Sequence, residues 1–130
     1  MKQTNLANAE ELICEQIKQI YLQQLEQDLS QISCRIFDQV LILVLEGVIT
    51  PPENLLNQNN NLRLVSQVRS VFDQMIQDQI QDLVEQTLNV TVIDFLFDTG
   101  IESGRTGAIV IFEFQCHRSY LNISDDSNYN

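Results

Sequence analysis

The chain has 130 residues, of which 44% are hydrophobic, and this is enough for one domain with a core of ordinary size. Its 7 Lys and Arg residues against 18 Asp and Glu leave a formal net charge of -11, which argues against binding to a nucleic-acid backbone. No segment approaches the roughly twenty apolar residues of a membrane span or the apolar core of a secretory signal, so we expect a cytoplasmic protein.

The first predicted element is a long amphipathic helix from Leu6 to Leu29, because apolar residues recur there every three or four positions. Residues 30–33 are compatible with a turn, and a β pattern then runs from Cys34 to Phe37. The next strand, Val40 to Leu45, follows after only two residues, which predicts an antiparallel hairpin. Its six apolar residues in a row indicate a central strand that is covered on both faces.

A helix start follows Gly47, which marks the end of the second strand. Thr50 can cap the helix, Pro51 suits its first turn, and Glu53 completes a capping box. The sequence from Asn54 to Asn61 is rich in asparagine and predicts a flexible polar loop after a single helical turn.

The second long helix is expected from about Leu62 to Leu88. Apolar residues form one stripe of this helix, and the residues assigned to the opposite, polar face are Arg69, Asp73, Gln77, Asp78, Gln81, Asp82 and Glu85. Some of these carboxylates have i,i+4 spacing, but this pattern is typical of a solvated helix face, and we predict no metal site.

Two more strands are expected at Val90 to Phe97 and Ala108 to Phe114, joined by a glycine-bearing loop of roughly ten residues. Cys116 and His117 follow, and adjacent strand residues point to opposite faces, so they predict no catalytic pair. The three cysteines are odd in number and widely spaced, which predicts reduced thiols without a disulfide or zinc site. We expect one domain over residues 1–118 and a polar, flexible tail over 119–130.

The predicted order α-β-β-α-β-β indicates an α+β fold with two layers, in which a four-stranded, mainly antiparallel sheet carries both long helices on one face. Such a monomer leaves apolar side chains on the bare sheet face, and exposed apolar patches usually bind a partner. We therefore predict a homodimer formed through the sheet or an edge strand. The candidate interface residues are Leu41, Leu43, Leu45, Ile109 and Ile111.

The loop from Asp98 to Gly107 is the other candidate site, since its glycines, hydroxyls and arginine could surround an anion. The candidate ligand contacts are Ser103, Gly104, Arg105, Thr106 and Gly107. The loop lacks the lysine and the following helix of a phosphate-binding loop, and turn geometry alone can account for the glycines.

Several segments resemble a family of small bacterial proteins, the MpsC family. These are Val40 to Glu53, the second-helix segment Leu64 to Arg69, Leu88 to Val90, and the loop Asp98 to Gly107. The sequences of the segments Phe37-Asp38-Gln39 and Glu102 to Arg105 most resemble those of cyanobacterial members. Many members carry Gly-Arg-Gly-Pro between the first helix and the first strand, whereas this chain has Asp28-Leu29-Ser30-Gln31.

The resemblance covers most of the chain and implies an accessory protein of a sodium-translocating, membrane-potential-generating system, linked to membrane energetics or to ion and inorganic-carbon uptake. It transfers no catalytic residue and no cofactor. We therefore expect a regulatory protein that is not an enzyme, acts by protein–protein interaction and associates with a membrane system only indirectly. The alternative expectation is a small-ligand or anion sensor that uses the loop over residues 98–107.

Overall fold

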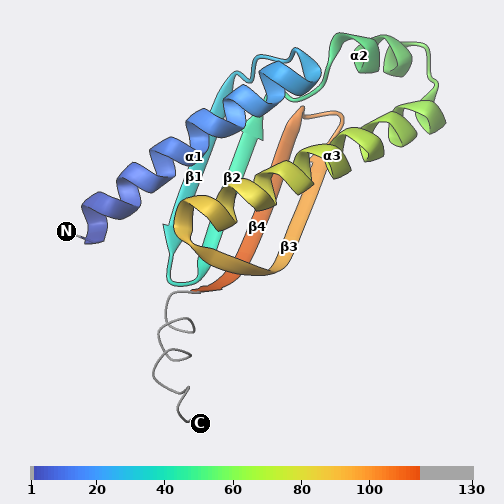
Figure 1. The fold of residues 1–130 in the computed structure, drawn as a ribbon. Coiled ribbons are helices and arrows are strands. Elements are labelled where there is room, and N and C mark those ends of the chain that lie inside the picture. The colour runs from blue at the N-terminus through green and yellow to red at the C-terminus, as the bar shows by residue number, and fades with distance from the viewer. Residues whose placement is uncertain (1, 115–130) are drawn as a thin grey trace.

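The computed structural model describes residues 2–114, so Cys116, His117 and the expected tail over 119–130 lie outside the described residues. Within the described part, three helices and four strands follow one another along the chain (Figure 1). They are α1 (Lys2–Leu25), β1 (Gln31–Phe37), β2 (Val40–Glu46), α2 (Pro51–Gln58), α3 (Leu62–Leu88), β3 (Val90–Gly100) and β4 (Arg105–Phe114).

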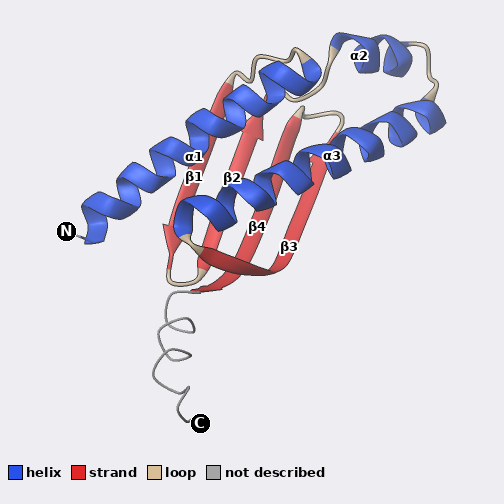
Figure 2. Ribbon diagram, viewed as in Figure 1, coloured by secondary structure: helices blue, strands red, loops and turns tan. Residues whose placement is uncertain are grey.

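The four strands form one sheet in the order β1-β2-β4-β3, and every neighbouring pair is antiparallel (Figure 2). The strands β2 and β4 are central, as the apolar run of β2 predicts, and β1 and β3 are the edges. This arrangement confirms the predicted α+β fold with a four-stranded antiparallel sheet.

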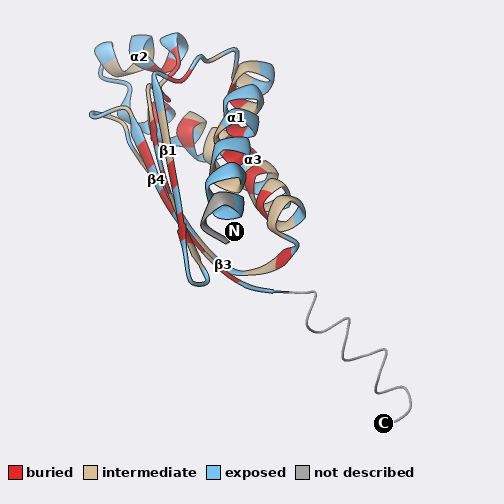
Figure 3. Cartoon of the chain, turned by 90° about the vertical axis from the view of Figure 1, so that its left-hand side faces the viewer, coloured by how far each residue is buried: buried red, intermediate tan, exposed pale blue. Residues whose placement is uncertain are grey.

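The long helices α1 and α3 both cover the same face of the sheet, and no helix of the described chain covers the other face (Figure 3). The core lies between the two layers. Its most buried members come from one face of each strand and the inward stripes of the helices, and they include Ile13, Ile17, Tyr21, Leu41, Leu43, Leu45, Ile76, Ile80, Val84, Val110 and Phe112.

The first helix ends at Leu25, four residues earlier than predicted, because Glu26 has a left-handed backbone with φ of 53°. Leu29 is nevertheless buried, so its place in the apolar pattern reflects core packing outside the helix. The expected turn over residues 30–33 is also wrong, since β1 already begins at Gln31. The Ser30 amide donates to the Glu46 carbonyl at 2.9 Å and so continues the pairing with β2.

The flexible loop expected from Asn54 to Asn61 is wrong over residues 54–58, which belong to the helix α2, and only residues 59–61 connect α2 to α3. The capping box forms as predicted: the Thr50 hydroxyl accepts from the Glu53 amide, and the Glu53 carboxylate accepts from the Thr50 amide. This well-formed start stabilises two turns despite the asparagine-rich composition. The bounds of α3, by contrast, are those that the periodicity predicts.

The strands β3 and β4 extend further toward each other than predicted, and the turn between them contains only residues 101–104. Gly104 has a positive φ of 73°, which suits the end of this tight turn. A register shift between Val92 and Asp94 places a β-bulge in β3.

Candidate functional site

The face of the sheet that no helix covers is the most prominent surface of the described chain. The strand register arranges its side chains in four rows across β1, β2, β4 and β3. The rows are Phe37-Val40-Ile111-Asp94, Arg35-Ile42-Ile109-Leu96, Ser33-Val44-Gly107-Asp98 and Gln31-Glu46-Arg105-Gly100. We call these sixteen residues the bare face. Its first two rows are mostly apolar, and its last row is polar.

Large apolar side chains on the bare face are open to solvent. Phe37 is 50% exposed, Leu96 54%, Ile109 39% and Val44 37%, and Ile42 beside them is partly exposed. A contiguous apolar patch of this kind in a folded domain usually marks a contact surface.

Three of the expected interface residues lie elsewhere. Leu41, Leu43 and Leu45 are fully buried beneath the helices, because they alternate with Ile42 and Val44 along β2. The prediction combined them with Ile109 and Ile111, which point to the opposite face. The register explains this error, since a shift of one residue exchanges the two faces of a strand. The residues of β2 on the bare face are Val40, Ile42, Val44 and Glu46.

The bare face has a shallow apolar hollow over Gly107. The hollow measures about 270 Å³, and Ile42, Val44, Leu96 and Ile109 contribute to its lining. A Cβ atom placed on Gly107 would meet no atom within 4 Å, so the space over this residue is open. The hollow can accept an apolar side chain from another molecule.

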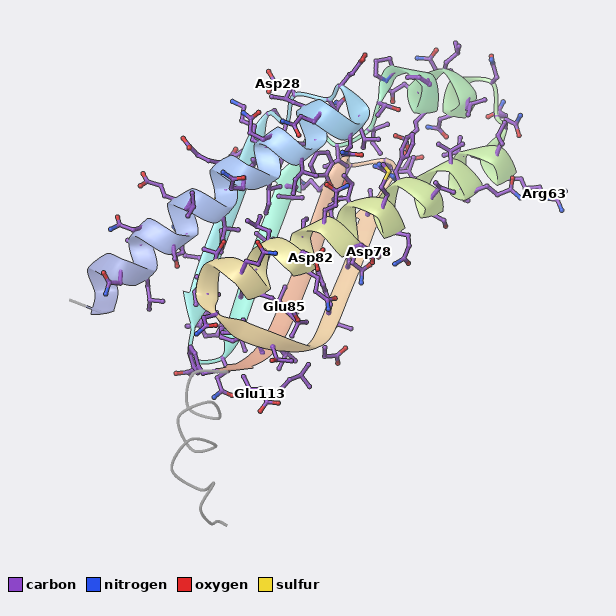
Figure 4. The ribbon with its side chains drawn as sticks, viewed as in Figure 1. Asp28, Arg63, Asp78, Asp82, Glu85 and Glu113 are labelled. Atoms are coloured by element: carbon purple, nitrogen blue, oxygen red, sulfur yellow. The ribbon has the colours of Figure 1, made fainter. Side chains whose placement is uncertain are left out.

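The helical side of the molecule is strongly acidic by comparison. Figure 4 labels Asp78, Asp82 and Glu85 along α3, and Asp78 and Asp82 are exposed. On α1, Glu11 and Glu15 are exposed as well. Another copy of the chain therefore meets less electrostatic repulsion at the bare face than at the helices.

The turn between β3 and β4 directs its polar groups at its own chain. The Gly104 carbonyl accepts from the Gly47 and Val48 amides at 3.0 and 3.1 Å. The Arg105 Nε lies 3.6 Å from Glu46 Oε1, so its guanidinium already has an acidic neighbour. The candidate ligand contacts from Ser103 to Gly107 remain a prediction without a supporting contact.

A buried ionic cluster lies where α2 meets α3. The Arg69 Nε lies 3.3 Å from Glu53 Oε2 and 3.4 Å from Asp73 Oδ1, and its Nη1 donates to the Val48 carbonyl. Glu53 is 0% exposed and Arg69 4%. The Arg69 Nε and Glu53 Oε2 are close enough for an ion pair but are not aligned as a hydrogen bond. Arg69 was predicted on the polar face of the helix, which is wrong, and the guanidinium also lies over the Phe72 ring.

The cluster continues to the sheet through hydroxyl groups. The Thr99 hydroxyl donates to Asp73 Oδ1 at 3.0 Å and lies 2.6 Å from the Thr106 hydroxyl, which also bonds the Tyr21 side chain. Burial raises the pKa of the Asp73 carboxyl above its ordinary value, although the Arg69 guanidinium opposes this shift. The cluster thus joins α1, α2, α3 and the sheet at one end of the molecule.

The sequence carried a signal for this cluster that the helix pattern obscured. Val65, Arg69, Phe72 and Ile76 are spaced by four, three and four residues, so Arg69 falls on the apolar stripe itself. Its acidic partner Glu53 was identified only as a capping residue. An arginine on an apolar stripe together with a buried carboxylate points to a structural ion pair.

Cys14 on α1 and Cys34 on β1 come together in space and share a side-chain hydrogen bond, although they are twenty residues apart. Burial raises the pKa of the Cys34 thiol to about 12, and it also raises the pKa of the Cys14 thiol. These protonated thiols are poor nucleophiles at neutral pH.

The other acidic side chains of α3 have separate roles. Glu85 accepts from the Val92 amide, and Asp78 accepts from Gln74.

Over residues 2–114, no group of three or more His, Cys, Asp or Glu side chains is arranged to hold a metal ion. Within the same range, no helix has the length and apolar character needed to cross a bilayer.

The fold and the bare face define a small two-layer α+β protein that offers an apolar sheet surface. The family described as Na+-translocating membrane potential-generating system (MpsC) matches residues 6–114. This range includes every strand, α2, α3 and most of α1, and the chain belongs to the MpsC family. No similar chain was found among the curated proteins or among the solved structures.

Proposed function

We propose that this protein is a cytoplasmic accessory component of a sodium-translocating, membrane-potential-generating system and that it acts by protein–protein interaction. The family description supports the link to membrane energetics. The observation that carries the proposed mechanism is the bare face, whose exposed Phe37, Val44, Leu96 and Ile109 form an apolar surface for a partner.

The partner on this face is a second copy of the chain. Pairing two bare faces buries apolar surface and leaves the acidic helices outermost, where they are farthest apart. The helices of the dimer then remain available to other components of the system. A regulatory role that is not enzymatic fits this arrangement, because the ionic cluster around Arg69 is buried and serves packing.

Complementation of a deletion strain tests the proposal. The parent gene should restore the sodium-dependent membrane potential, measured with a potential-sensitive dye. The variant Ile42→Asp/Ile109→Asp should fail to restore it, because two carboxylates would enter the apolar rows of the bare face.

A matched control carries the same two charges away from this face. Leu55 and Val71 are 60% and 64% exposed on α2 and α3, so Leu55→Asp/Val71→Asp should fold and dimerise like the parent and shows whether two added carboxylates disturb the protein by themselves. Equal complementation by the bare-face variant, at equal protein level, would contradict the proposed role of the face.

A further inference from the structure

We propose that two copies pair their bare faces about a two-fold axis that runs parallel to the strands, so that β2 of each copy lies over β4 of the other. This inference rests on the homodimer proposed above and adds its geometry. It follows from the strand order and the register, because two sheets that pack with aligned strands leave two directions for a two-fold axis, along the strands or across them.

An axis along the strands keeps each row of the bare face at its own level. Val40 then meets the partner's Ile111, and Ile42 meets the partner's Ile109, so each apolar row covers the same row of the partner. Aligned sheets pack with their strand directions rotated by about 30°, and contacts near the centre of the interface change least under this rotation. The central strands β2 and β4 lie beside the axis.

An axis across the strands would reverse the order of the rows. Val40 would then lie over the partner's Glu46, and Ile111 over the partner's Arg105. These pairs lie on the central strands, where burial of a charge against an apolar side chain is unfavourable because water cannot reach it. The composition of the rows therefore favours the axis along the strands.

The hollow over Gly107 gives this arrangement shape complementarity. Val44 and Gly107 are direct neighbours in the same row, on β2 and β4. The axis along the strands places the Val44 side chain, which is 37% exposed, over the partner's Gly107. One protruding side chain on each copy thus meets the hollow of the other.

The charges at the two edges are complementary in the same arrangement. Arg35 on β1 is exposed and makes no ion pair with the described residues of its own chain. It comes to lie at the level of the partner's Leu96, between the partner's Asp94 and the partner's Asp98. Both aspartates are exposed on the edge strand β3.

The size of the bare face predicts a reversible dimer. A strand spacing of about 4.8 Å and a rise of about 3.3 Å per residue make the face about 19 Å wide and about 23 Å long. Covering it on both copies removes on the order of 1,000 Å² from solvent, which is at the low end for specific interfaces. Dissociation should therefore be measurable at micromolar concentrations.

A charge exchange tests the geometry by sedimentation equilibrium. Arg35→Glu alone and Asp94→Lys/Asp98→Lys alone should each weaken the homodimer by about tenfold or more at low salt, because like charges then meet at both edges. A mixture of the two variants should form a heterodimer close to parental affinity, since both edges are complementary again. The control Arg63→Glu makes the same charge change on the exposed start of α3 and should leave the dimer unchanged.

The remaining outcomes distinguish a wrong two-fold axis from a wrong homodimer. Unimpaired homodimers of the two charge variants, or a mixture that stays as weak as its components, would overturn the axis while leaving the dimer intact. A parent that is monomeric throughout would instead overturn the homodimer itself. Circular dichroism of each variant shows whether a loss of association reflects a loss of folding.

Discussion

At the scale of single residues, the buried contact between Arg69 and Glu53 is the most sensitive point of the fold. Arg69→Met should lower the free energy of unfolding by about 3–5 kcal/mol, because it leaves the fully buried Glu53 carboxylate without its counter-ion. Urea denaturation measures this loss. The double variant Glu53→Gln/Arg69→Met should be more stable than Arg69→Met, and a further loss of stability would argue against a direct pair.

Asp73 should make the stability of the protein depend on pH in a defined direction. Burial raises its folded-state pKa above the unfolded value of 3.8, so the folded state binds the proton more tightly. The contribution of Asp73 to the free energy of unfolding is therefore fully present below pH 3.8 and is lost as the pH rises through the folded-state pKa. The variant Asp73→Asn has no titratable group at this position. Relative to it, the parent should lose stability as the pH rises from 3.8 through the folded-state pKa of Asp73.

Urea unfolding of both proteins between about pH 4 and about pH 7 provides the comparison. The stability difference should shift in favour of Asp73→Asn as the pH rises and then level off. The other carboxyl groups are common to both proteins and largely cancel. A difference that is constant, or that shifts in favour of the parent, would show that burial does not dominate the Asp73 pKa.

At the scale of elements, the tight connection after β2 depends on Gly47. Its φ is 78°, and an added Cβ would lie 2.9 Å from Ser30 Oγ and 3.1 Å from the Ser30 backbone nitrogen. Gly47→Ala should therefore destabilise the protein by roughly 2 kcal/mol. Gly107→Ala is the matched control, because a Cβ there meets no atom of its own chain within 4 Å, and thermal unfolding at high dilution, where the proposed dimer is dissociated, should separate the two variants. Equal melting temperatures would contradict the strain at Gly47.

The elements also show where sequence patterns suffice. The bounds of α3 follow from a long periodic stripe, and the capping box of α2 follows from Thr50 and Glu53, since both signals are local. The predicted length of α2 was too short because the asparagine-rich composition favours a loop. Composition does not show how strongly the capping box stabilises the first turn. The early end of α1 depends on the left-handed backbone of Glu26, which has no sequence signature.

The candidate site was only partly predictable for a different reason. The excess of apolar residues in β2 and β4 correctly indicated an uncovered sheet face. Which residues occupy it depends on the register, and an unbroken apolar run such as Val40 to Leu45 gives no alternation from which to read the faces. Likewise, the meeting of Arg69 and Glu53 arises from the placement of α2 against α3, which is a tertiary contact.

At the scale of the whole molecule, the uneven distribution of charge and apolar surface determines how two copies can associate. A chain with a net charge of -11 should repel its own copies, yet the charges on its bare face nearly balance around an apolar centre, with Arg35 and Arg105 against Glu46, Asp94 and Asp98. Association through this face hides the apolar rows and keeps the acidic helices apart. The sheet thus determines the partner, and the helices remain free for the rest of the system.

Sedimentation equilibrium of the parent beside Ile42→Asp/Ile109→Asp tests whether the bare face forms the homodimer. The parent should approach twice the chain mass of 15.0 kDa at high micromolar concentration and dissociate on dilution, whereas the variant should stay at the single-chain mass while remaining folded. A parent that stays at 15.0 kDa over the whole range, or a variant that associates as strongly as the parent, would contradict it.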